Sequence, residues 1–159
     1  MMNIKFYDTS SLLLKADSIF DNEEFSLISS ITLHELEYIK NASNKDPDVK
    51  YAARHLLNEL DAHSNNYGVV VYKEEFNKYI KRFELNNDLK ILACACDYSK
   101  NHPVDEVIFV TNDLCLKHIA KLYFGSKVQS VKEDYDSYAG YKEVYLTDDE
   151  MTEFYQNFN

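Results

Sequence analysis

The stretch NIKFYDTSSLLL, residues 3–14, predicts a strand that passes at once into a helix. Ile4, Phe6 and Asp8 lie on one face of the expected strand, because successive side chains of a strand point to opposite sides. The three hydroxyl residues that follow are suited to capping a helix, and the three leucines to its apolar face. Asp8 therefore stands at the carboxyl end of a strand, which is where open α/β sheets bind their ligands.

Strand and helix patterns alternate along the rest of the chain. We expect strands at 3–8, 68–73, 106–111 and 127–131, a strand or helix lead-in at 26–31, and helices at 10–17, 32–43, 48–64, 87–100 and 113–124. This alternation predicts an α/β fold in which a mainly parallel sheet is covered by helices.

The length of 159 residues suits one domain with a sizeable core. We therefore expect a single domain over residues 1–159, in which 134–159 form a C-terminal extension packed on the rest. A short strand near 143–146 and a helix near 148–157 are expected there. No apolar run approaches the roughly 20 residues that cross a membrane, and the N-terminus does not resemble a signal peptide. We expect a cytoplasmic protein with no membrane partner.

Glu35 stands in the expected helix at 32–43. Thr32 and Glu35 have the spacing of a capping box, which predicts that the helix begins at Thr32. Glu35 shares a helix face with Ile39, so its side chain is expected to point inward among apolar neighbours. Glu37 lies roughly 200° around the helix from Glu35 and is expected to face water.

Asp88 and Asp113 stand in similar settings. Asp88 falls in the first turn of an expected helix, on the face that also carries Ile91 and Leu92. Asp113 follows the apolar strand at 106–111 and precedes a helix whose apolar stripe begins at Leu116. Both carboxylates are thus expected on the inward side of a helix start.

These four acids allow two interpretations. Any one of them alone is explained by helix capping and by the helix dipole, which favour acids at helix starts. Four together are harder to explain so, because clustered carboxylates repel each other and raise one another's pKa unless positive charge compensates them. No lysine or arginine recurs beside all four. A divalent metal site is therefore the interpretation that we favour.

The order of the four acids also resembles a known family. The segments are Asp8-Thr9-Ser10, Glu35-Leu36-Glu37-Tyr38-Ile39-Lys40, Asn87-Asp88-Leu89-Lys90-Ile91 and Thr111-Asn112-Asp113-Leu114. In order and spacing they resemble the four acidic motifs of the PIN-domain nucleases, and most of all the N-terminal PIN module of PhoH-like proteins. Segments 51–60 and 138–144 also look PhoH-like. The resemblance covers nearly the whole chain and implies a three-layer α/β/α PIN-like fold with a central, mainly parallel sheet.

The activity that this resemblance implies is a Mg²⁺- or Mn²⁺-dependent ribonuclease that hydrolyses phosphodiester bonds of single-stranded RNA. Carboxylate oxygens suit such hard cations, which activate water and orient the scissile phosphate. Metal ligation is assigned to Asp8, Asp88 and Asp113, and ligation or activation of water to Glu35. Ser10, Thr111 and Asn112 are expected to hold these carboxylates or to meet phosphate.

Two features of the chain limit this picture. No G-x-x-x-x-G-K-[ST] motif is present, so the chain is either a stand-alone PIN protein or a domain cut from a longer chain. The partner that the resemblance implies is a P-loop ATPase domain or subunit. The net charge of −10 opposes binding to a polyanion. Lys78, Lys81 and Arg82, which lie among aromatic residues, are therefore the expected RNA contacts. The basic solvent face of an amphipathic helix is an equally good interpretation of them.

Two other functions stay open. One is a catalytically silent PIN-like module that binds RNA or regulates a partner ATPase. The other is the toxin of a toxin–antitoxin pair. A homo-oligomer is compatible with each of these functions.

Overall fold

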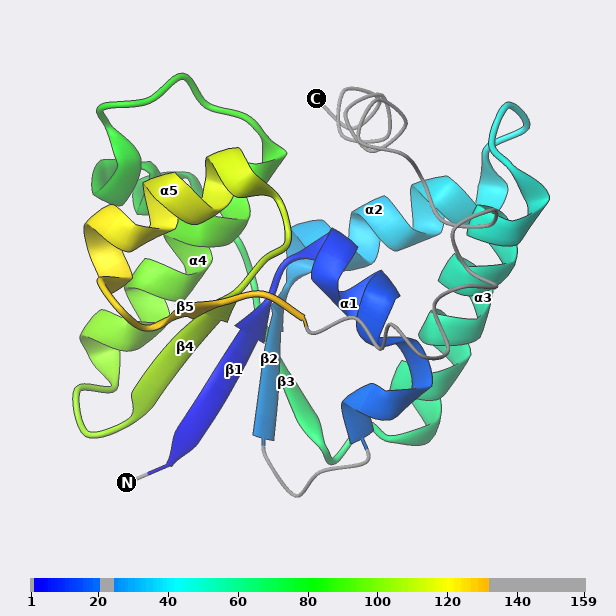
Figure 1. The fold of residues 1–159 in the computed structure, drawn as a ribbon, viewed down its shortest axis with the longest axis horizontal. Helices are drawn as coiled ribbons and strands as arrows, with labels where there is room; N and C mark the ends of the chain where they lie inside the picture. The colour runs from blue at the N-terminus through cyan, green and yellow to red at the C-terminus, as the bar shows by residue number, and fades with distance from the viewer. Residues whose placement is uncertain (1, 21–24, 132–159) are drawn as a thin grey trace.

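The computed structural model describes residues 2–20 and 25–131 of the chain (Figure 1). The strands are β1 (Asn3–Tyr7), β2 (Phe25–Ser29), β3 (Tyr67–Val70), β4 (Glu106–Val110) and β5 (Val128–Gln129). The α-helices are α1 (Thr9–Lys15), α2 (Ser30–Asn41), α3 (Pro47–Ala62), α4 (Asn87–Asn101) and α5 (Leu114–Phe124). Two 3₁₀ helices, η1 (Ala16–Phe20) and η2 (Glu74–Ile80), lie between them.

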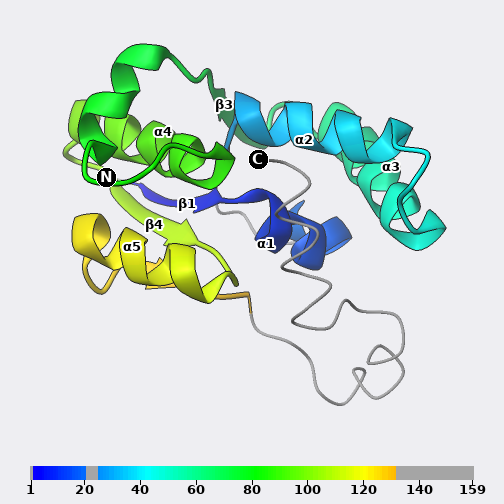
Figure 2. The same ribbon diagram turned by 90° about the horizontal axis from the view of Figure 1, so that it is seen from above.

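The five strands form one sheet in the order β3-β2-β1-β4-β5, and every neighbouring pair is parallel. Parallel neighbours need a crossover, which the helices provide. Seen from above in Figure 2, α4 and α5 lie on one side of the sheet and α1 and α3 on the other. The predicted α/β fold with a parallel central sheet between two helical layers is confirmed.

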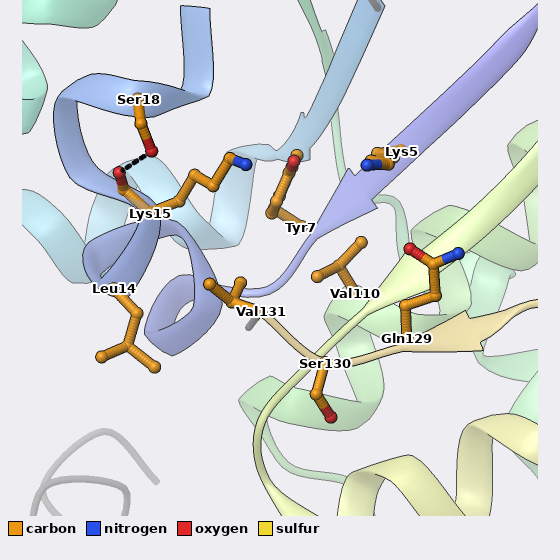
Figure 3. Close-up of a pocket in the computed structure, with 9 residues that line it drawn as sticks. All are labelled: Lys5, Tyr7, Leu14, Lys15, Ser18, Val110, Gln129, Ser130 and Val131. Carbon is orange, nitrogen blue, oxygen red and sulfur yellow. Dashed lines mark hydrogen bonds between the residues drawn. The ribbon is translucent and has the colours of Figure 1, made fainter. Parts of the chain in front are cut away.

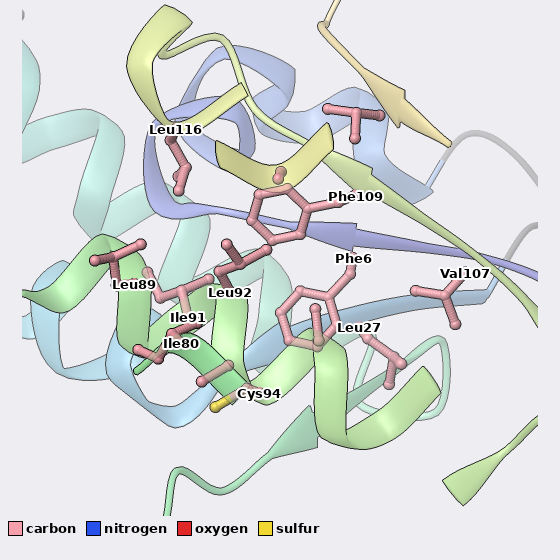
Figure 4. Packing of buried hydrophobic residues seen from close by; sticks show 14 of the residues in the cluster. Phe6, Leu27, Ile80, Leu89, Ile91, Leu92, Cys94, Val107, Phe109 and Leu116 are labelled. Carbon is pink, nitrogen blue, oxygen red and sulfur yellow. The ribbon is translucent and has the colours of Figure 1, made fainter. Parts of the chain in front are cut away.

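The alternation of the strand side chains builds one core on each face of the sheet. Phe6 of β1 and Phe109 of β4 are fully buried beneath α4 and α5, with their ring centroids 6.2 Å apart (Figure 4). Tyr7 and Val110, one residue further on, belong to the opposite core with α1, α2 and α3. Burial of one such side chain stabilises the fold by about 1.5–3 kcal/mol. The helices on both faces of the sheet are therefore packed against the carboxyl ends of β1 and β4.

Most element boundaries fall close to the predicted ones, and two details were wrong. Helix α2 begins at Ser30, and the Ser29 hydroxyl caps it by accepting from the Ile31 amide at 3.0 Å. The predicted capping box at Thr32 is therefore not the helix start. Strand β3 ends at Val70 rather than near 73, because the Tyr72 amide donates to the Ser30 hydroxyl at 2.8 Å instead of continuing the ladder.

The extension expected at 134–159 lies outside the described residues. A single domain over 1–159 remains a proposal. None of the helices within 2–20 and 25–131 is long and apolar enough to cross a membrane.

Candidate functional site

Three strands deliver polar residues to the same edge of the sheet. Asp8 follows β1, the buried Ser29 ends β2 and starts α2, and Thr111 follows β4. Carboxyl ends of parallel strands share an edge, and α4, which returns antiparallel to the strands, places Asp88 at that edge as well. The fold thus gathers side chains that lie far apart in the sequence.

Asp8 is fully buried, with 0% of its surface exposed. Its Oδ1 accepts from the Ser11 amide at 2.9 Å and its Oδ2 from the Thr111 hydroxyl at 2.6 Å. Burial raises the pKa of Asp8, the hydrogen bonds from Ser11 and Thr111 oppose that rise, and the charge of Asp113 adds to it. Asp8 is therefore a buried acid whose oxygens are already held by the protein.

Glu35 is also buried, on the inward face of α2 as predicted. The Thr9 hydroxyl, at the start of α1, lies 2.7 Å from Oε1 of Glu35 and donates to it. Burial raises the pKa of Glu35 to about 7, against the hydrogen bond from Thr9 and with a contribution from the charge of Asp8. Glu35 thus titrates near neutrality and is electrostatically coupled to Asp8.

Asp88 differs from these two acids in its surroundings. It is half-buried in the first turn of α4, and the cap of that helix is Asn86, whose Oδ1 accepts from the Leu89 amide at 2.9 Å. Within the described part of the chain, no group donates a hydrogen bond to the Asp88 carboxylate. Burial, followed by the charges of Asp8, Glu35 and Asp113, raises the pKa of Asp88 to about 8. It therefore interacts with all three other acids.

Asp113 is half-buried and does cap a helix. Its Oδ1 accepts from the Leu116 amide at 3.1 Å at the start of α5. Its own amide donates to the Thr111 hydroxyl at 3.1 Å. The capping interpretation therefore holds for Asp113, although its charge also acts on Asp8 and Asp88.

The neighbouring polar residues only partly follow the prediction. Thr111 holds Asp8, and the Ser10 hydroxyl lies 3.4 Å from each carboxylate oxygen of Asp8. Asn112 instead bonds the backbone of Val131, accepting its amide at 2.7 Å and donating to its carbonyl at 3.3 Å. The side-chain amide of Asn112 therefore holds the segment that follows β5 and forms no hydrogen bond with any of the four acids.

Sequence reasoning missed two residues that bind the acids directly. Thr9 donates to Glu35, and Ser11 donates its amide to Asp8 and its hydroxyl to the Val110 carbonyl at 2.9 Å. The run of hydroxyls after Asp8 was the available signal. It was interpreted only as helix capping, because the contact between Thr9 and Glu35 joins residues 26 positions apart.

The donor set suits a hard divalent cation by chemistry, since it offers carboxylate oxygens from four residues. The oxygens of Asp8 accept hydrogen bonds from Ser11 and Thr111 and lie near the Ser10 hydroxyl, whereas the oxygens of Asp88 have no donor among the described residues. Among the described residues, however, no three His, Cys, Asp or Glu side chains form a group that could hold a metal ion as they stand. The acids are coupled through their charges without forming a closed cage.

A cavity of about 690 Å³ lies beside the site rather than within it (Figure 3). Its walls come from β1, α1, η1, β4 and the segment from β5 to residue 131, and they include Lys5, Tyr7 and Lys15. None of the four acids lines it. A second cavity, of about 230 Å³, contains the predicted RNA contacts Lys78, Lys81 and Arg82.

Comparison with known proteins identifies the fold family. The model of the PIN domain family matches residues 6–130, and no curated protein matches the chain. Twelve chains of solved structures match. One is described as the crystal structure of VapBC2 from Rickettsia felis bound to a DNA fragment from their promoter. The match has 18% identity and a TM-score of 0.49, and covers 82% of this chain and 99% of that chain. This likeness is too low to bear on activity or partners.

Proposed function

Since this chain belongs to the PIN domain family, we propose that it is a metal-dependent ribonuclease that hydrolyses phosphodiester bonds of single-stranded RNA. One observation carries this proposal, namely that the fold gathers Asp8, Glu35, Asp88 and Asp113 at one edge of the sheet, where Asp88 interacts with the other three acids. Burial and the charges of neighbouring acids together disfavour the ionised forms of Asp8, Glu35 and Asp88. A bound cation would offset the free-energy cost of ionising these carboxyls. Carboxyls with a purely structural role would have no need to be gathered at such a cost.

The residues that would hold Mg²⁺ or Mn²⁺ are Asp8, Asp88 and Asp113. A divalent cation supplies Lewis acidity toward phosphate oxygens and acidifies water. Glu35 ligates as well or accepts the proton of the attacking water, for which a pKa of about 7 is well matched to neutral pH. Thr9, Ser11 and Thr111 orient the two buried acids through the hydrogen bonds described above. The Ser10 hydroxyl lies 3.4 Å from each carboxylate oxygen of Asp8 and would help to orient that carboxylate.

The decisive experiment is cleavage of an unstructured single-stranded RNA with millimolar Mn²⁺ or Mg²⁺, against an EDTA control. The variant is Asp88→Asn, and its matched control is Asp48→Asn, an exposed acid in the first turn of α3. Asp88→Asn should lose at least about a hundredfold in rate, as when one electrostatic group of an active site is removed. Asp48→Asn should cleave like the wild type. Full activity of Asp88→Asn would refute the assignment.

Metal binding itself is tested by thermal stability, without reference to cleavage. A ligand at 100 times its Kd stabilises the folded state by about 2.7 kcal/mol. Mn²⁺ should therefore raise the melting temperature of the wild type and of Asp48→Asn by equal amounts, and that of Asp88→Asn by less. An equal gain in all three proteins would place the bound metal elsewhere.

A catalytically silent module that binds RNA or regulates a P-loop ATPase is the second candidate. It is favoured by the lack of a ready metal-holding group of three among the described residues. RNA binding without cleavage under every metal condition above would decide for this candidate. Segments 51–60 and 138–144 resemble PhoH-like proteins, so a P-loop ATPase is the partner that we propose to test first.

A further inference from the structure

A small cavity opens on the surface between η2 and the end of α5, away from the four acids. It has a volume of about 230 Å³ and is lined by Lys78, Tyr79, Lys81, Arg82, Leu122 and Tyr123. Leu122 is 63% exposed and Tyr123 36% exposed, so both side chains are accessible to a ligand in the cavity. Pockets for drug-sized ligands have volumes of about 300–1,000 Å³. This cavity therefore suits one flat group such as a single base.

The charge around the cavity is opposite in sign to that of the whole protein. The chain has a net charge of −10, yet the cavity contributes three cations and no acid to its lining. Lys81 and Arg82 are exposed and form no ion pair with any described residue. The positive charge of Arg82 reaches Tyr123, where it opposes the rise in the tyrosine pKa that burial causes. A cation and an aromatic ring from different elements thus share one surface site.

Tyr79 forms the fixed wall of this cavity. Its hydroxyl donates to Oδ1 of Asp97 at 2.9 Å, and Lys78 Nζ lies 5.3 Å from the centre of its ring. Asp97 and Glu75 are the acids that act on Tyr79. Both are absent from the lining, so the cations alone face a ligand in the cavity.

Helix α5 connects this cavity to the acids. It begins at the capping residue Asp113 and reaches Tyr123 ten residues later, a distance of about 15 Å along the helix axis. Between them it carries Lys117, His118 and Lys121 and no acidic residue. No acidic residue of α5 therefore opposes a chain of phosphates between Asp113 and the cavity, and an oligonucleotide can span that length whereas a mononucleotide cannot.

We propose that this cavity is a nucleotide-binding subsite for single-stranded RNA, in which a base stacks on Tyr123 and Leu122 and its phosphate meets Arg82 and Lys81. The inference deepens the proposed function, because it defines a substrate that continues beyond the scissile phosphate. A duplex keeps its bases stacked on one another and could not offer one to Tyr123. An acidic protein segment would meet the same cations without using the ring.

The test is the binding of a fluorescein-labelled dodecanucleotide of uridine in EDTA, followed by fluorescence anisotropy. Tyr123→Ala should weaken binding about fivefold or more through lost stacking. Arg82→Ala should weaken it and lower the slope of log Kd against log salt by about 0.7. The matched controls are Tyr51→Ala and Arg54→Ala, exposed residues on α3, which should bind like the wild type.

Effects of equal size in the control pair, or none in either pair, would overturn the subsite. Binding of an RNA duplex as tightly as the single strand, or displacement of the RNA by polyglutamate at equal charge concentration, would also overturn it. The measurement needs no metal and no cleavage. Loss of binding in Tyr123→Ala and Arg82→Ala together with an inert wild type would therefore refute hydrolysis and retain the subsite. Cleavage by the wild type together with unaltered RNA binding in both variants would refute the subsite and retain hydrolysis.

Discussion

The acid cluster has two halves that differ in how the protein treats the charge. The hydroxyl-lined half consists of Asp8 and Glu35 with their donors Thr9, Ser11 and Thr111. The α4–α5 half consists of Asp88 and Asp113 at the starts of those helices. Both acids of the first half are buried and receive hydrogen bonds, whereas Asp88 is half-buried and coupled to three like charges.

This difference separates two roles for a carboxylate. A buried acid with donors at 2.6–2.9 Å is held in one orientation, so part of its desolvation cost is already offset by the fold. Asp88 has no such compensation among the described residues. Its charge is therefore the one that depends most on a partner from outside the chain, which makes it the most informative position to change.

The largest expected effect is a fall in the stability of the metal-free protein as pH rises. The pKa of Glu35 rises from 4.5 to about 7 and that of Asp88 from 3.8 to about 8 on folding. The folded state thus binds these protons more tightly than the unfolded chain does. The resulting stability is complete below about pH 4 and is lost as pH rises through 7 and 8. For Glu35 alone the loss is on the order of 3 kcal/mol.

Urea unfolding in EDTA at a series of pH values measures this loss. Asp88→Asn should flatten the profile, because it removes one titrating group and one repulsive charge. Saturating Mn²⁺ should flatten the wild-type profile in the same pH range. A wild type whose stability stays constant from pH 4.5 to 8 would show that folding does not raise the pKa of Glu35 and Asp88.

The next effect is a difference of sign between the two halves. In metal-free protein at pH 7.5, Asp8→Asn should destabilise the fold by about 2 kcal/mol. The two carboxylate oxygens of Asp8 accept from the Ser11 amide and the Thr111 hydroxyl, whereas an asparagine side chain has a single acceptor oxygen and so loses one of these hydrogen bonds. Asp88→Asn should instead stabilise by about 1 kcal/mol, because it removes a carboxylate whose charge is disfavoured by burial and by the three other acids. Urea midpoints of the two variants give both values. Destabilisation of equal size in both would mean that the halves do not differ.

The sequence predicted the strand and helix order and the inward position of Glu35, because both depend on local periodicity. It did not predict the sheet order or the hydrogen bonds within the site. Thr9 meets Glu35 and Thr111 meets Asp8 only after the strands pair, across 26 and 103 positions of chain. Asn112 illustrates the converse, since a residue adjacent to a site acid turned out to bond Val131.

A smaller effect should come from the hydroxyl of Thr111, which links the two halves. It donates to Asp8 at 2.6 Å and accepts from the Asp113 amide at 3.1 Å. Thr111→Val keeps the shape but removes both bonds, so it should destabilise by about 1–2 kcal/mol. Thr111→Ser, which keeps the hydroxyl, should restore most of that loss in urea unfolding. Equal loss in both variants would assign the effect to packing.

The smallest effect is expected two residues from Glu35, at Glu37. Glu37 is exposed, and its pKa is lowered first by the hydrogen bond with Lys40, which lies 2.9 Å away, and then by that with Asn41. These partners are on the solvent face of α2, and exposed pairs of this kind contribute little. Glu37→Gln should therefore leave RNA cleavage and the Mn²⁺-induced rise in melting temperature unchanged, whereas Glu35→Gln should reduce both. Loss of cleavage in Glu37→Gln would mean that substrate reaches the solvent face of α2, and the inward direction of Glu35 would then no longer distinguish the acid that acts from its neighbour.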